Sequence, residues 1–537
     1  MAADERRSAG ERVPRWFWAA LVILLVFAFP YFEAVRNANE LPRLLQGAAL
    51  VEDGSFAIDG PAARGLRPGP DIARSPVDGR IYPNKPPGAS LVCAVAYGLA
   101  GVDADIRGAP RTLRSYTLWA RLLTGVLPTL LLCVAFARRL AEPLGARPVM
   151  AAVALYALAT PAWSYGHLVY GHQLAACLLW IGLLTLLRAV DEGGRAASVR
   201  ALVGGALAGA SVVVDYNAVF AGLPIAGWIV WSVACRPPTR APAIAGALGA
   251  CLPILGLCAY HDAVFGSPLQ TGYHHVINPE FARKHGEGLL GLGRPTLAAL
   301  HTHITSTASG LTWWAPLWLV GAWGLARGRR IDRAPVRHVF WVSIAVLAVY
   351  VLTTASLNFE GGWRVGPRYL VIALPAVIPG VAWSLARPIQ PRLAPLALAG
   401  IGALAAWSVT INGLAANLWP HIDLTNVHQP VSEVLLPLLR HGRAPYHLAF
   451  GVEGGVVWAL VAAALALVLW TVGRARAGDR GGWIALIVGA ALGLGLVAAT
   501  PRLFTPHPRA AANLRYIEKV WEPTPGRVAP SRRFTPR

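Results

Sequence analysis

Glu40, Lys85 and Arg368 are far apart in the chain, and each lies beside an apolar segment and could take part in acid–base or phosphate chemistry. Glu40 follows Asn39 in an amphipathic segment, 39–54, that is typical of a helix lying in a membrane interface. A carboxylate held where lipid meets water could act as a general base for an acceptor hydroxyl. The alternative is a first-turn acid that complements the helix dipole, and spacing alone favours this structural interpretation.

Lys85 lies in the segment Asp78-Gly-Arg-Ile-Tyr82-Pro-Asn-Lys85-Pro-Pro-Gly88, directly before an apolar stretch. The two prolines and the glycine fix the backbone direction and predict that a helix starts after the lysine. A lysine ammonium is a compact point charge suited to phosphate. The alternative is a snorkelling lysine at the membrane surface with no substrate. The chain uses arginine almost everywhere else, so a lysine here mildly favours the functional interpretation.

Gly361-Gly-Trp-Arg364-Val-Gly-Pro367-Arg368-Tyr369 is the most informative of the remaining polar segments. Arg368 directly follows a Gly-Pro turn and opens an apolar run, so its guanidinium is expected at the membrane surface, where it could bind phosphate through two hydrogen bonds. The competing interpretation is an ordinary arginine anchor. Arg364 and Arg368 nevertheless stand out, because other loops on the same predicted side carry little positive charge.

His172 and Asp215 are further polar residues at the ends of apolar runs. His172 heads a span and could reach a cavity, whereas Asp215 could line the same cavity or be solvated, with nothing to favour either. His167 and His172 are five residues apart and do not share a helix face, so a metal site is not indicated. The six cysteines show no C-x-x-C or Cys/His ligand spacing, which predicts neither a zinc site nor a disulfide framework.

Long apolar runs are the elements that must position these residues. A membrane-crossing helix needs about 20 mostly apolar residues, and the chain is 55% hydrophobic but only 14% charged, unlike soluble domains. We therefore predict an all-α polytopic membrane protein with about thirteen transmembrane helices. The predicted spans lie near 15–33, 116–137, 149–165, 170–187, 200–214, 217–234, 241–260, 311–326, 336–355, 368–386, 394–414, 450–472 and 482–499.

Arginines in the short loops predict which side each loop occupies. Loops of one parity are rich in arginine, whereas the short loops of the other parity hold only Arg364. The positive-inside rule then places the N-terminus, 1–14, in the cytoplasm and the long loops outside an inner membrane. The apolar stretch 88–101 is short, so we expect it to be re-entrant or interfacial. The outer loops are 33–115, 261–310 and 415–448, and the side of the basic tail, 501–537, stays open.

Net charge +21 would normally suggest a nucleic-acid partner. Here the basic residues punctuate apolar spans instead of forming one face, so the expected partner is the membrane and not nucleic acid. Every predicted cytoplasmic loop is also too short to hold a nucleotide-binding fold.

Three ordered motifs resemble the GT-C superfamily of membrane glycosyltransferases, whose nearest kin here look like bacterial relatives of protein O-mannosyltransferases and aminoarabinose transferases. The motifs are Asn39-Glu40 followed by Arg43, "GRIYPNKPPGASL" at 79–91, and "GGWRVGPRYLVIALP" at 361–375. Their order and the long first outer loop also match, and the resemblance covers about 15–390. It leaves the C-terminal helices of 391–500 and the tail unplaced.

The resemblance implies roles for individual residues. The family's base is an acid in the first outer loop, commonly in an Asp-Glu pair, so only Glu40 can inherit that role here. Lys85 and Arg368 look like phosphate contacts, and many relatives carry an acid where this chain has His172, which puts a two-carboxylate metal scheme in doubt. Donor-binding candidates are Lys85, Arg368, Arg364, Tyr82 and Tyr369; further cavity candidates are Asn39, Arg43, Asp78, His172 and Asp215; no metal ligand or cofactor is indicated.

The resemblance implies an enzyme that moves a sugar from a polyprenyl-phosphate donor to an acceptor hydroxyl at the outer membrane face, with inversion and with Glu40 as base. The acceptor could be a glycan, a lipid or a protein. An O-antigen ligase or polymerase is an alternative, although its large outer loop would be expected late in the chain. A transporter or flippase is another, but we see no internal repeat and no charges at the middle of the spans.

Overall fold

Helices dominate this computed structural model, which describes residues 12–31, 37–64, 68–108, 111–192, 194–236, 239–288, 291–331, 334–357 and 361–521. Within these residues, ten helices are long and apolar enough to cross a membrane. This confirms the predicted all-α polytopic membrane fold, whereas the number of crossings stays a prediction. The long helices are α5 (Gly88–Ile106), the continuous α6–η2–α7 (Leu113–Leu144), α10 (His172–Glu192), α11 (Arg195–Val214), α12 (Ala218–Cys235), α13 (Arg240–Phe265), α18 (Ala334–Ala355), α20 (Ala394–Asn417), α22 (Gly454–Arg476) and α23 (Arg480–Leu503).

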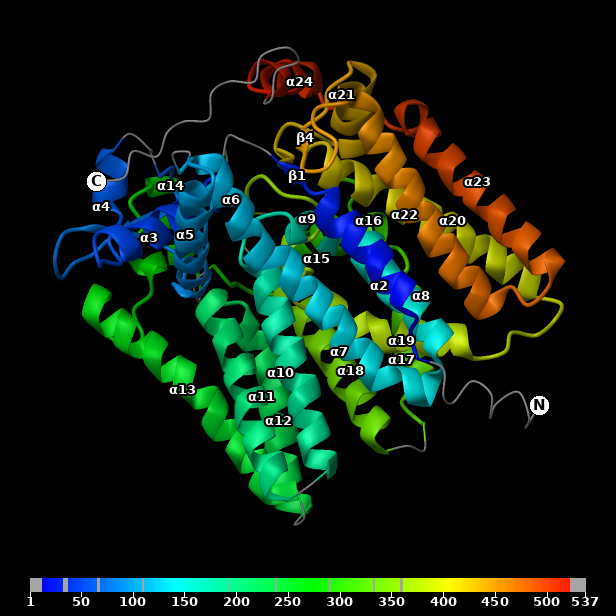
Figure 1. Cartoon of the computed structure of the whole chain (residues 1–537), viewed down its shortest axis with the longest axis horizontal. Helices are drawn as coiled ribbons and strands as arrows, with labels where there is room; N and C mark the ends of the chain where they lie inside the picture. Colours follow the sequence, from blue (N-terminus) through cyan, green and yellow to red (C-terminus); the bar gives the residue numbers. More distant parts are fainter. Residues whose placement is uncertain are drawn as a thin grey trace.

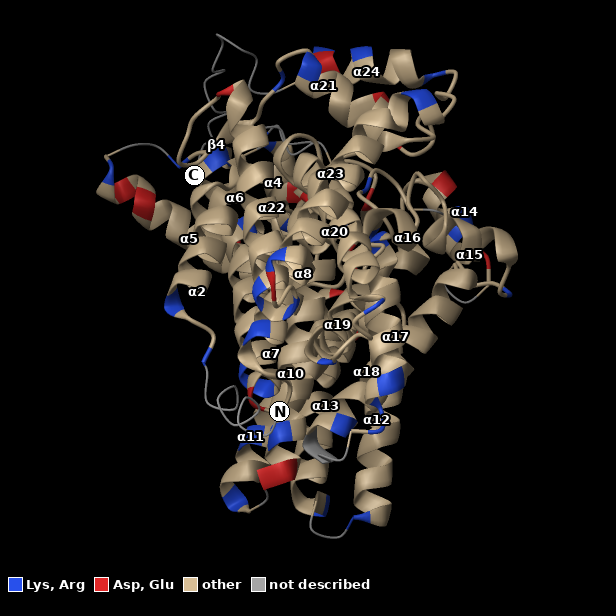
Figure 2. Cartoon of the chain, turned by 90° about the vertical axis from the view of Figure 1, so that its right-hand side faces the viewer, with Lys and Arg blue, Asp and Glu red and all other residues tan. Residues whose placement is uncertain are grey.

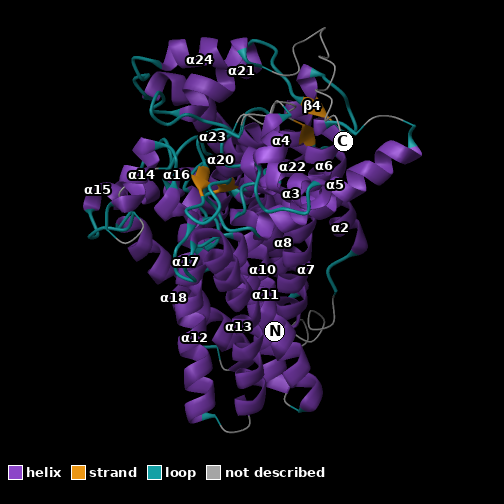
Figure 3. Ribbon diagram, turned by 90° about the vertical axis from the view of Figure 1, so that its left-hand side faces the viewer, coloured by secondary structure: helices purple, strands orange, loops and turns teal. Residues whose placement is uncertain are grey.

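Shorter helices and two small sheets complete the described structure. Three shorter apolar helices match predicted spans: α2–η1 (Arg15–Phe27), α8 (Ala146–Leu158) and η6–α19 (Leu374–Ala386). The remaining helices are α3 (Leu41–Glu52), α4 (Asp59–Ala63), α9 (Ala162–Gly166), η4 (Gly272–His275), α14 (Pro279–Gly286), α15 (Leu297–Ile304), α16 (Leu311–Trp314), α17 (Trp318–Gly328), η5 (Arg368–Leu370), η7 (Val431–Leu435), α21 (Leu436–Arg440) and α24 (Ala510–Lys519). Strand β1 (Pro30–Tyr31) pairs with β4 (Tyr446–His447), and β2 (Ile72–Arg74) pairs with β3 (Ile81–Pro83), both antiparallel. Figure 3 shows that the strands lie toward one end of the molecule.

The arginine-rich loops meet at the opposite end, which we call the basic end. Arg139 in the last turns of α7 forms an ion pair with Asp191 near the end of α10. Arg236, just after α12, lies 3.2 Å from His338 Nε2 in the first turns of α18. These contacts agree with the alternation of loops predicted from the sequence, and Figure 2 shows Lys and Arg positions on the ribbon there. Which side of a membrane the basic end faces stays a prediction.

Helix α5 lies at the other end and extends further than expected, to Ile106. Its length would allow a membrane crossing, but it lies beside α3 and α6, beyond the ends of α10 and α11 (Figure 1). A side chain on Gly88, its first residue, would meet the backbone of Val213 in the last turn of α11. Whether α5 crosses a membrane or lies at its surface stays a prediction.

Helices α10, α11 and α13 pack closely through small residues, as membrane helices often do. A Cβ atom added to Gly205 of α11 would lie 1.9 Å from the carbonyl oxygen of Gly246 in α13. The two backbones are therefore in direct contact. This contact fixes the axial position of α11, and with it the position of Asp215, the residue that follows the helix.

Candidate functional site

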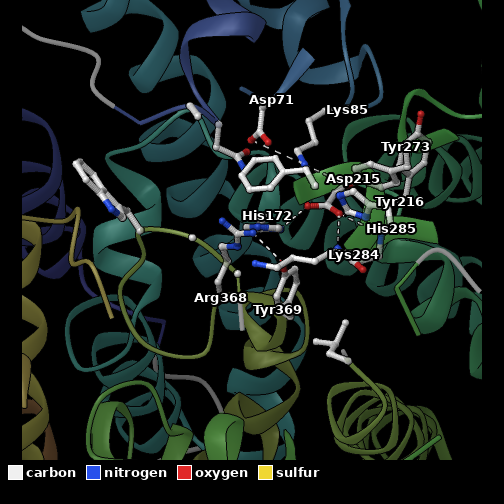
Figure 4. A pocket seen from close by; sticks show the side chains of 18 of the residues that line it. Asp71, Lys85, His172, Asp215, Tyr216, Tyr273, Lys284, His285, Arg368 and Tyr369 are labelled. Carbon is white, nitrogen blue, oxygen red and sulfur yellow. Dashed lines mark hydrogen bonds and ion pairs between the residues drawn. The ribbon is translucent and has the colours of Figure 1, made fainter. Parts of the chain in front are cut away.

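A cavity of about 930 Å³ lies at the end of the helical bundle opposite the basic end. Its walls come from the first outer loop, the start of α10, the turn between α11 and α12, the second outer loop and the 361–369 segment (Figure 4). The polar and charged lining residues are Asn37, Asn39, Arg43, Asp71, Lys85, His172, Asp215, Tyr216, Asn217, Tyr273, Glu280, Lys284, His285, Trp363, Arg368, Tyr369, Asp423 and Thr425.

Lys85 is placed in the cavity by the β2–β3 hairpin and the prolines after it. Its ammonium nitrogen lies 3.9 Å from Asp71 Oδ2 and 3.4 Å from the Tyr273 hydroxyl. The same nitrogen is 4.7 Å from the centre of the Tyr273 ring, a distance suited to a cation–π contact. Burial lowers the pKa of Lys85, and the nearby Asp71 carboxylate opposes that effect. The ammonium is therefore only loosely paired and can still bind an anion in the cavity.

Arg43 projects from the first turns of α3 into the same cavity and is only 2% exposed. Its guanidinium donates to the main-chain and side-chain oxygens of Asn39, both of which are neutral. It also lies against Gly171, where an added Cβ atom would be 3.4 Å from Nη2 and where φ is +86°. Among the described residues, no carboxylate lies within ion-pair distance of Arg43.

Arg368 is the first residue of the short helix η5 and is 7% exposed. Gly366, with φ at +58°, and Pro367 turn the chain into that helix. The Arg368 guanidinium donates to the Tyr369 hydroxyl at 2.8 Å. Within the described part of the chain it has no carboxylate partner either. Two buried guanidinium groups thus face one cavity with only neutral hydrogen-bond acceptors.

A hydrogen bond joins His172 and Asp215 on the cavity wall, between His172 Nδ1 and Asp215 Oδ2. The other oxygen of Asp215 accepts from the backbone and side-chain nitrogens of Asn217, each at 3.0 Å. Burial alone raises the pKa of Asp215, but the pairing with His172 and the hydrogen bonds from Asn217 hold it at about 2. The carboxylate therefore stays ionised and holds the imidazole by one nitrogen.

Glu40 lies outside the cavity lining, although its neighbour Asn39 is part of it. Its side chain is fully buried and is paired with Arg121 of α6, 3.2 Å from Arg121 Nη2. The same carboxylate accepts a hydrogen bond from the backbone nitrogen of Val169 at 2.9 Å. It also makes no capping bond, because α3 begins at Leu41 with no side-chain cap. The base role stays a prediction, and these surroundings favour a role in holding α3, α6 and the 169–172 turn together.

Three more candidate residues do not line the cavity. Tyr82 donates to Asp78 Oδ2 at 2.7 Å, and this bond lies in the turn of the β2–β3 hairpin. Burial raises the pKa of Asp78, but the hydrogen bond from Tyr82 brings it below its usual range. Arg364 is 1% exposed and bonds the Gly361 carbonyl, while its backbone nitrogen donates to Ile422 O at 3.0 Å. The structure thus places these three residues around the site, where they shape its loops.

Several lining residues carry no signal in the sequence that would mark them as part of a site. Asp71 lies in an unremarkable polar stretch, and only the pairing of β2 with β3 places it beside Lys85. Tyr273 lies 188 residues from Lys85 in the chain, and only the fold brings the two side chains together. Lys284 is an exception, because it is one of the few lysines and carries the same composition signal as Lys85. It pairs with Glu280 at 2.7 Å on α14, at the edge of the cavity.

A metal site is not evident in the described residues, which hold no group of three or more His, Cys, Asp or Glu side chains placed to bind an ion. The six cysteines are all free thiols, and three of them are buried in the helical bundle or against α3.

No protein-family model and no curated protein matches the chain. Among solved structures, ArnT from Cupriavidus metallidurans bound to undecaprenyl phosphate matches at 17% identity with a TM-score of 0.48, over 94% of this chain and 79% of that one. The arabinosyltransferase EmbB from Mycobacterium smegmatis matches at 16% identity and 0.42, over 93% and 43%. The oligosaccharyltransferase AglB from Archaeoglobus fulgidus, in complex with an inhibitory peptide and a dolichol-phosphate, matches at 14% and 0.44, over 97% and 61%. Identities and TM-scores this low do not assign an activity to the chain.

Proposed function

We propose that the chain is a membrane glycosyltransferase that takes a sugar from a polyprenyl-phosphate donor and transfers it to an acceptor hydroxyl. The observation that carries the proposal is the pair of buried guanidinium groups, Arg43 and Arg368, that face one cavity without a carboxylate partner among the described residues. A buried charge is costly unless it is paired. Together with the ammonium of Lys85, the two guanidinium groups would be stabilised by an anionic ligand. A phosphate has both the negative charge and the acceptor oxygens to pair with them.

An apolar edge of the cavity suits a ligand whose tail stays in lipid. Val219, Phe220, Phe281, Leu292 and Leu357 line this edge. Val219 is 47% exposed, on the first turn of α12. A prenyl chain could therefore leave the cavity along α12 into the membrane while its phosphate stays beside the cations. A free sugar nucleotide has no apolar tail that would contact this edge.

Aromatic side chains occupy the polar part of the cavity, where Tyr216, Tyr273, Trp363 and Tyr369 line the wall. Ring faces and hydroxyl groups of this kind offer both apolar contact and hydrogen bonds, as a sugar ring requires. The sugar of the donor would then lie between the cations and this wall. The identity of the sugar and of the acceptor is left open by these contacts.

The cations would act on the leaving group. When the acceptor oxygen attacks the anomeric carbon, the bond from that carbon to the phosphate oxygen breaks and its electron pair leaves with the phosphate. Preorganised positive groups at that oxygen lower the barrier because they act where charge develops. One direct displacement of this kind inverts the anomeric centre. Glu40 enters the proposal as a residue that positions Val169 and Arg121, since it does not line the cavity.

Variants of the three cations test the proposal. Arg43→Gln, Lys85→Ala and Arg368→Gln should each lower transfer from a panel of polyprenyl-phosphate sugars by about 100-fold or more, the scale of losing one preorganised donor. Arg107→Ala is the matched control, because this arginine is 71% exposed and pairs only with Asp103 among the contacts described. Transfer unchanged in all three variants would contradict the proposal. So would transbilayer movement of the donor with its sugar–phosphate bond intact, the behaviour of a flippase.

A further inference from the structure

His172 and Asp215 form an acid–base pair on the cavity wall that has no role in the proposed binding of the phosphate. His172 is the first residue of α10, and Asp215 directly follows the last residue of α11. Asp215 is fixed from two sides, by the hydrogen bond from His172 Nδ1 and by the two hydrogen bonds from Asn217. Its carboxylate therefore sets the orientation of the imidazole ring.

The second ring nitrogen of His172, Nε2, has no hydrogen-bond partner among the described residues, although the side chain is only 5% exposed. Aromatic rings surround the imidazole, with the centres of Tyr165, Tyr170 and Tyr369 between 6.0 and 6.4 Å away. Figure 4 shows His172 and Asp215 side by side, with Arg368 and Tyr369 close to the imidazole. A buried polar atom that lines a cavity and has no partner is open to a ligand atom.

The carboxylates that line the cavity are otherwise engaged. Asp71 faces Lys85, and Glu280 pairs with Lys284 at 2.7 Å. Asp423 accepts hydrogen bonds from Thr425 and Asn426 within its own turn. Of the acid–base groups that the structure describes on this wall, the His172–Asp215 pair combines an oriented ring with an unpartnered nitrogen.

We propose that His172 is the general base of the transfer reaction and that Asp215 is its positioning residue. This inference rests on the glycosyltransferase function proposed above. The acceptor hydroxyl gives its proton to His172 Nε2 as its oxygen forms the new bond to the anomeric carbon. The bond between that carbon and the phosphate oxygen breaks, and the electron pair leaves with the phosphate. The imidazolium that results is paired with Asp215, which stabilises its charge, as a carboxylate does for a catalytic histidine.

The structure also gives Glu40 a place in this step. Its carboxylate holds the backbone nitrogen of Val169, three residues before His172, and a hydrogen bond from Tyr170 to Trp363 O at 3.0 Å ties the same turn to the 361–369 segment. Glu40 therefore helps to set the position of His172 at the start of α10 without reaching the reacting atoms. Glu40 thus affects the proposed reaction through the position of His172.

The test compares transfer with donor-site binding in the full chain reconstituted in lipid vesicles. His172→Gln should lower kcat by 100-fold to 10,000-fold, the usual range for a general base, while the affinity for undecaprenyl phosphate, used as the binding probe, changes less than threefold. Asp215→Asn should lower kcat by a smaller factor and leave KM for the donor unchanged. The double variant should be no slower than His172→Gln alone, because the two residues act as a unit.

Three results would overturn the inference. Full kcat in His172→Gln shows that the histidine is not the base. A loss of undecaprenyl phosphate affinity that parallels the loss of rate makes His172 a binding residue. If the two substitutions lower kcat independently, so that their effects multiply in the double variant, Asp215 does not act through His172. Since a single change could leave a buried charge and unfold the chain, the double variant, which removes both, serves as the folded reference. A wild-type chain that neither binds the probe nor transfers any sugar would instead refute the proposed function itself.

Discussion

At the scale of single residues, two cationic side chains of the site are held in place without a close carboxylate partner among the described residues. Arg43 rests on the neutral oxygens of Asn39, and Arg368 on a tyrosine hydroxyl. The ammonium nitrogen of Lys85 lies 3.9 Å from Asp71 Oδ2. In the sequence, Lys85 stands out because lysine is rare in the chain, and Arg368 because the other loops on its predicted side carry little positive charge; both line the cavity. Arg43 carried the same signal less clearly, because it lies in a helix with other polar residues.

The ion-pair partner of Glu40 could not be predicted from the sequence. This partner, Arg121, is 81 residues away and lies inside a predicted span. A buried arginine within an apolar helix must have a partner, and that signal was present in the sequence. No spacing rule could say which acid would supply it, because α6 and α3 are brought together only by the fold.

A substitution at Glu40 separates the positioning role from the base role. Glu40→Gln should lower transfer activity and thermal stability together, because Arg121 loses its carboxylate inside the protein, a change that costs about 3–5 kcal/mol. The double variant Glu40→Gln with Arg121→Met should recover part of both, since no buried charge remains. Melting temperature and transfer rate, measured on the same preparations, check this expectation. A double variant that regains stability but stays fully inactive would identify Glu40 as the base.

Asp215 should give the protein a specific response to acid. Its pKa is held at about 2, below its ordinary value, so the hydrogen bonds of its ionised carboxylate to His172 and Asn217 stabilise the folded state at neutral pH. That contribution is fully present above the ordinary pKa of about 4 and is lost as pH falls from there toward 2. Melting temperatures of the wild type and of Asp215→Asn should therefore differ at pH 7 and converge near pH 2. A constant difference across this range would contradict the assigned ionisation.

At the scale of elements, the spans were predictable and the outer segments were not. Runs of apolar residues locate helices without reference to partners, and twelve of the predicted spans fall on long or shorter apolar helices. The predicted span 311–326 instead falls on two short helices, α16 and α17, that are separated at 315–317. The β2–β3 hairpin, α14 and the end of α5 depend on contacts with distant segments. Helix α5 continues over Asp103 and Asp105 because it packs on α3 and α6 at its other face. The first span stops at Phe27 because the chain then enters β1, which pairs with β4.

The contact between α11 and α13 predicts a sharp dependence on side-chain size. Gly205→Ala places a methyl group 1.9 Å from the Gly246 carbonyl oxygen, so one backbone must move. Overpacking of this kind costs about 1–3 kcal/mol, and the displacement of α11 should also weaken transfer by shifting Asp215. Gly227→Ala on α12 is the matched control, because an added Cβ atom there has no neighbour within 4 Å. Equal melting temperatures for the two variants would contradict the tight contact.

At the scale of the whole molecule, the cavity and the arginine-rich loops lie at opposite ends of the helical bundle. The end that holds the cavity also carries α24, where Glu518 lies 2.8 Å from His441 in the loop after α21. The described part of the C-terminal tail therefore lies on the same side as the long loops (Figure 1). Charge counts could not decide this, because the tail is basic and late charges weigh little in topology.

The orientation of the molecule can be measured with two cysteines in an otherwise cysteine-free chain. Cys235 is exposed at the basic end of α12. Leu269 is 82% exposed in the second outer loop and can be changed to cysteine. In intact cells, an impermeant maleimide should label Leu269→Cys and should reach Cys235 only after the membrane is permeabilised. The opposite pattern would place the cavity on the cytoplasmic side and refute the outer-face reaction.

The proposed function requires that one cavity hold the phosphate of a polyprenyl carrier between Arg43, Lys85 and Arg368. The most direct measurement is an experimental structure of the full chain in lipid nanodiscs with undecaprenyl phosphate. We expect density for the phosphate within hydrogen-bonding distance of the three cations, with the prenyl chain leaving along Val219 and Phe220. Phosphate density at the basic end, or a cavity that stays empty at saturating lipid, would contradict it.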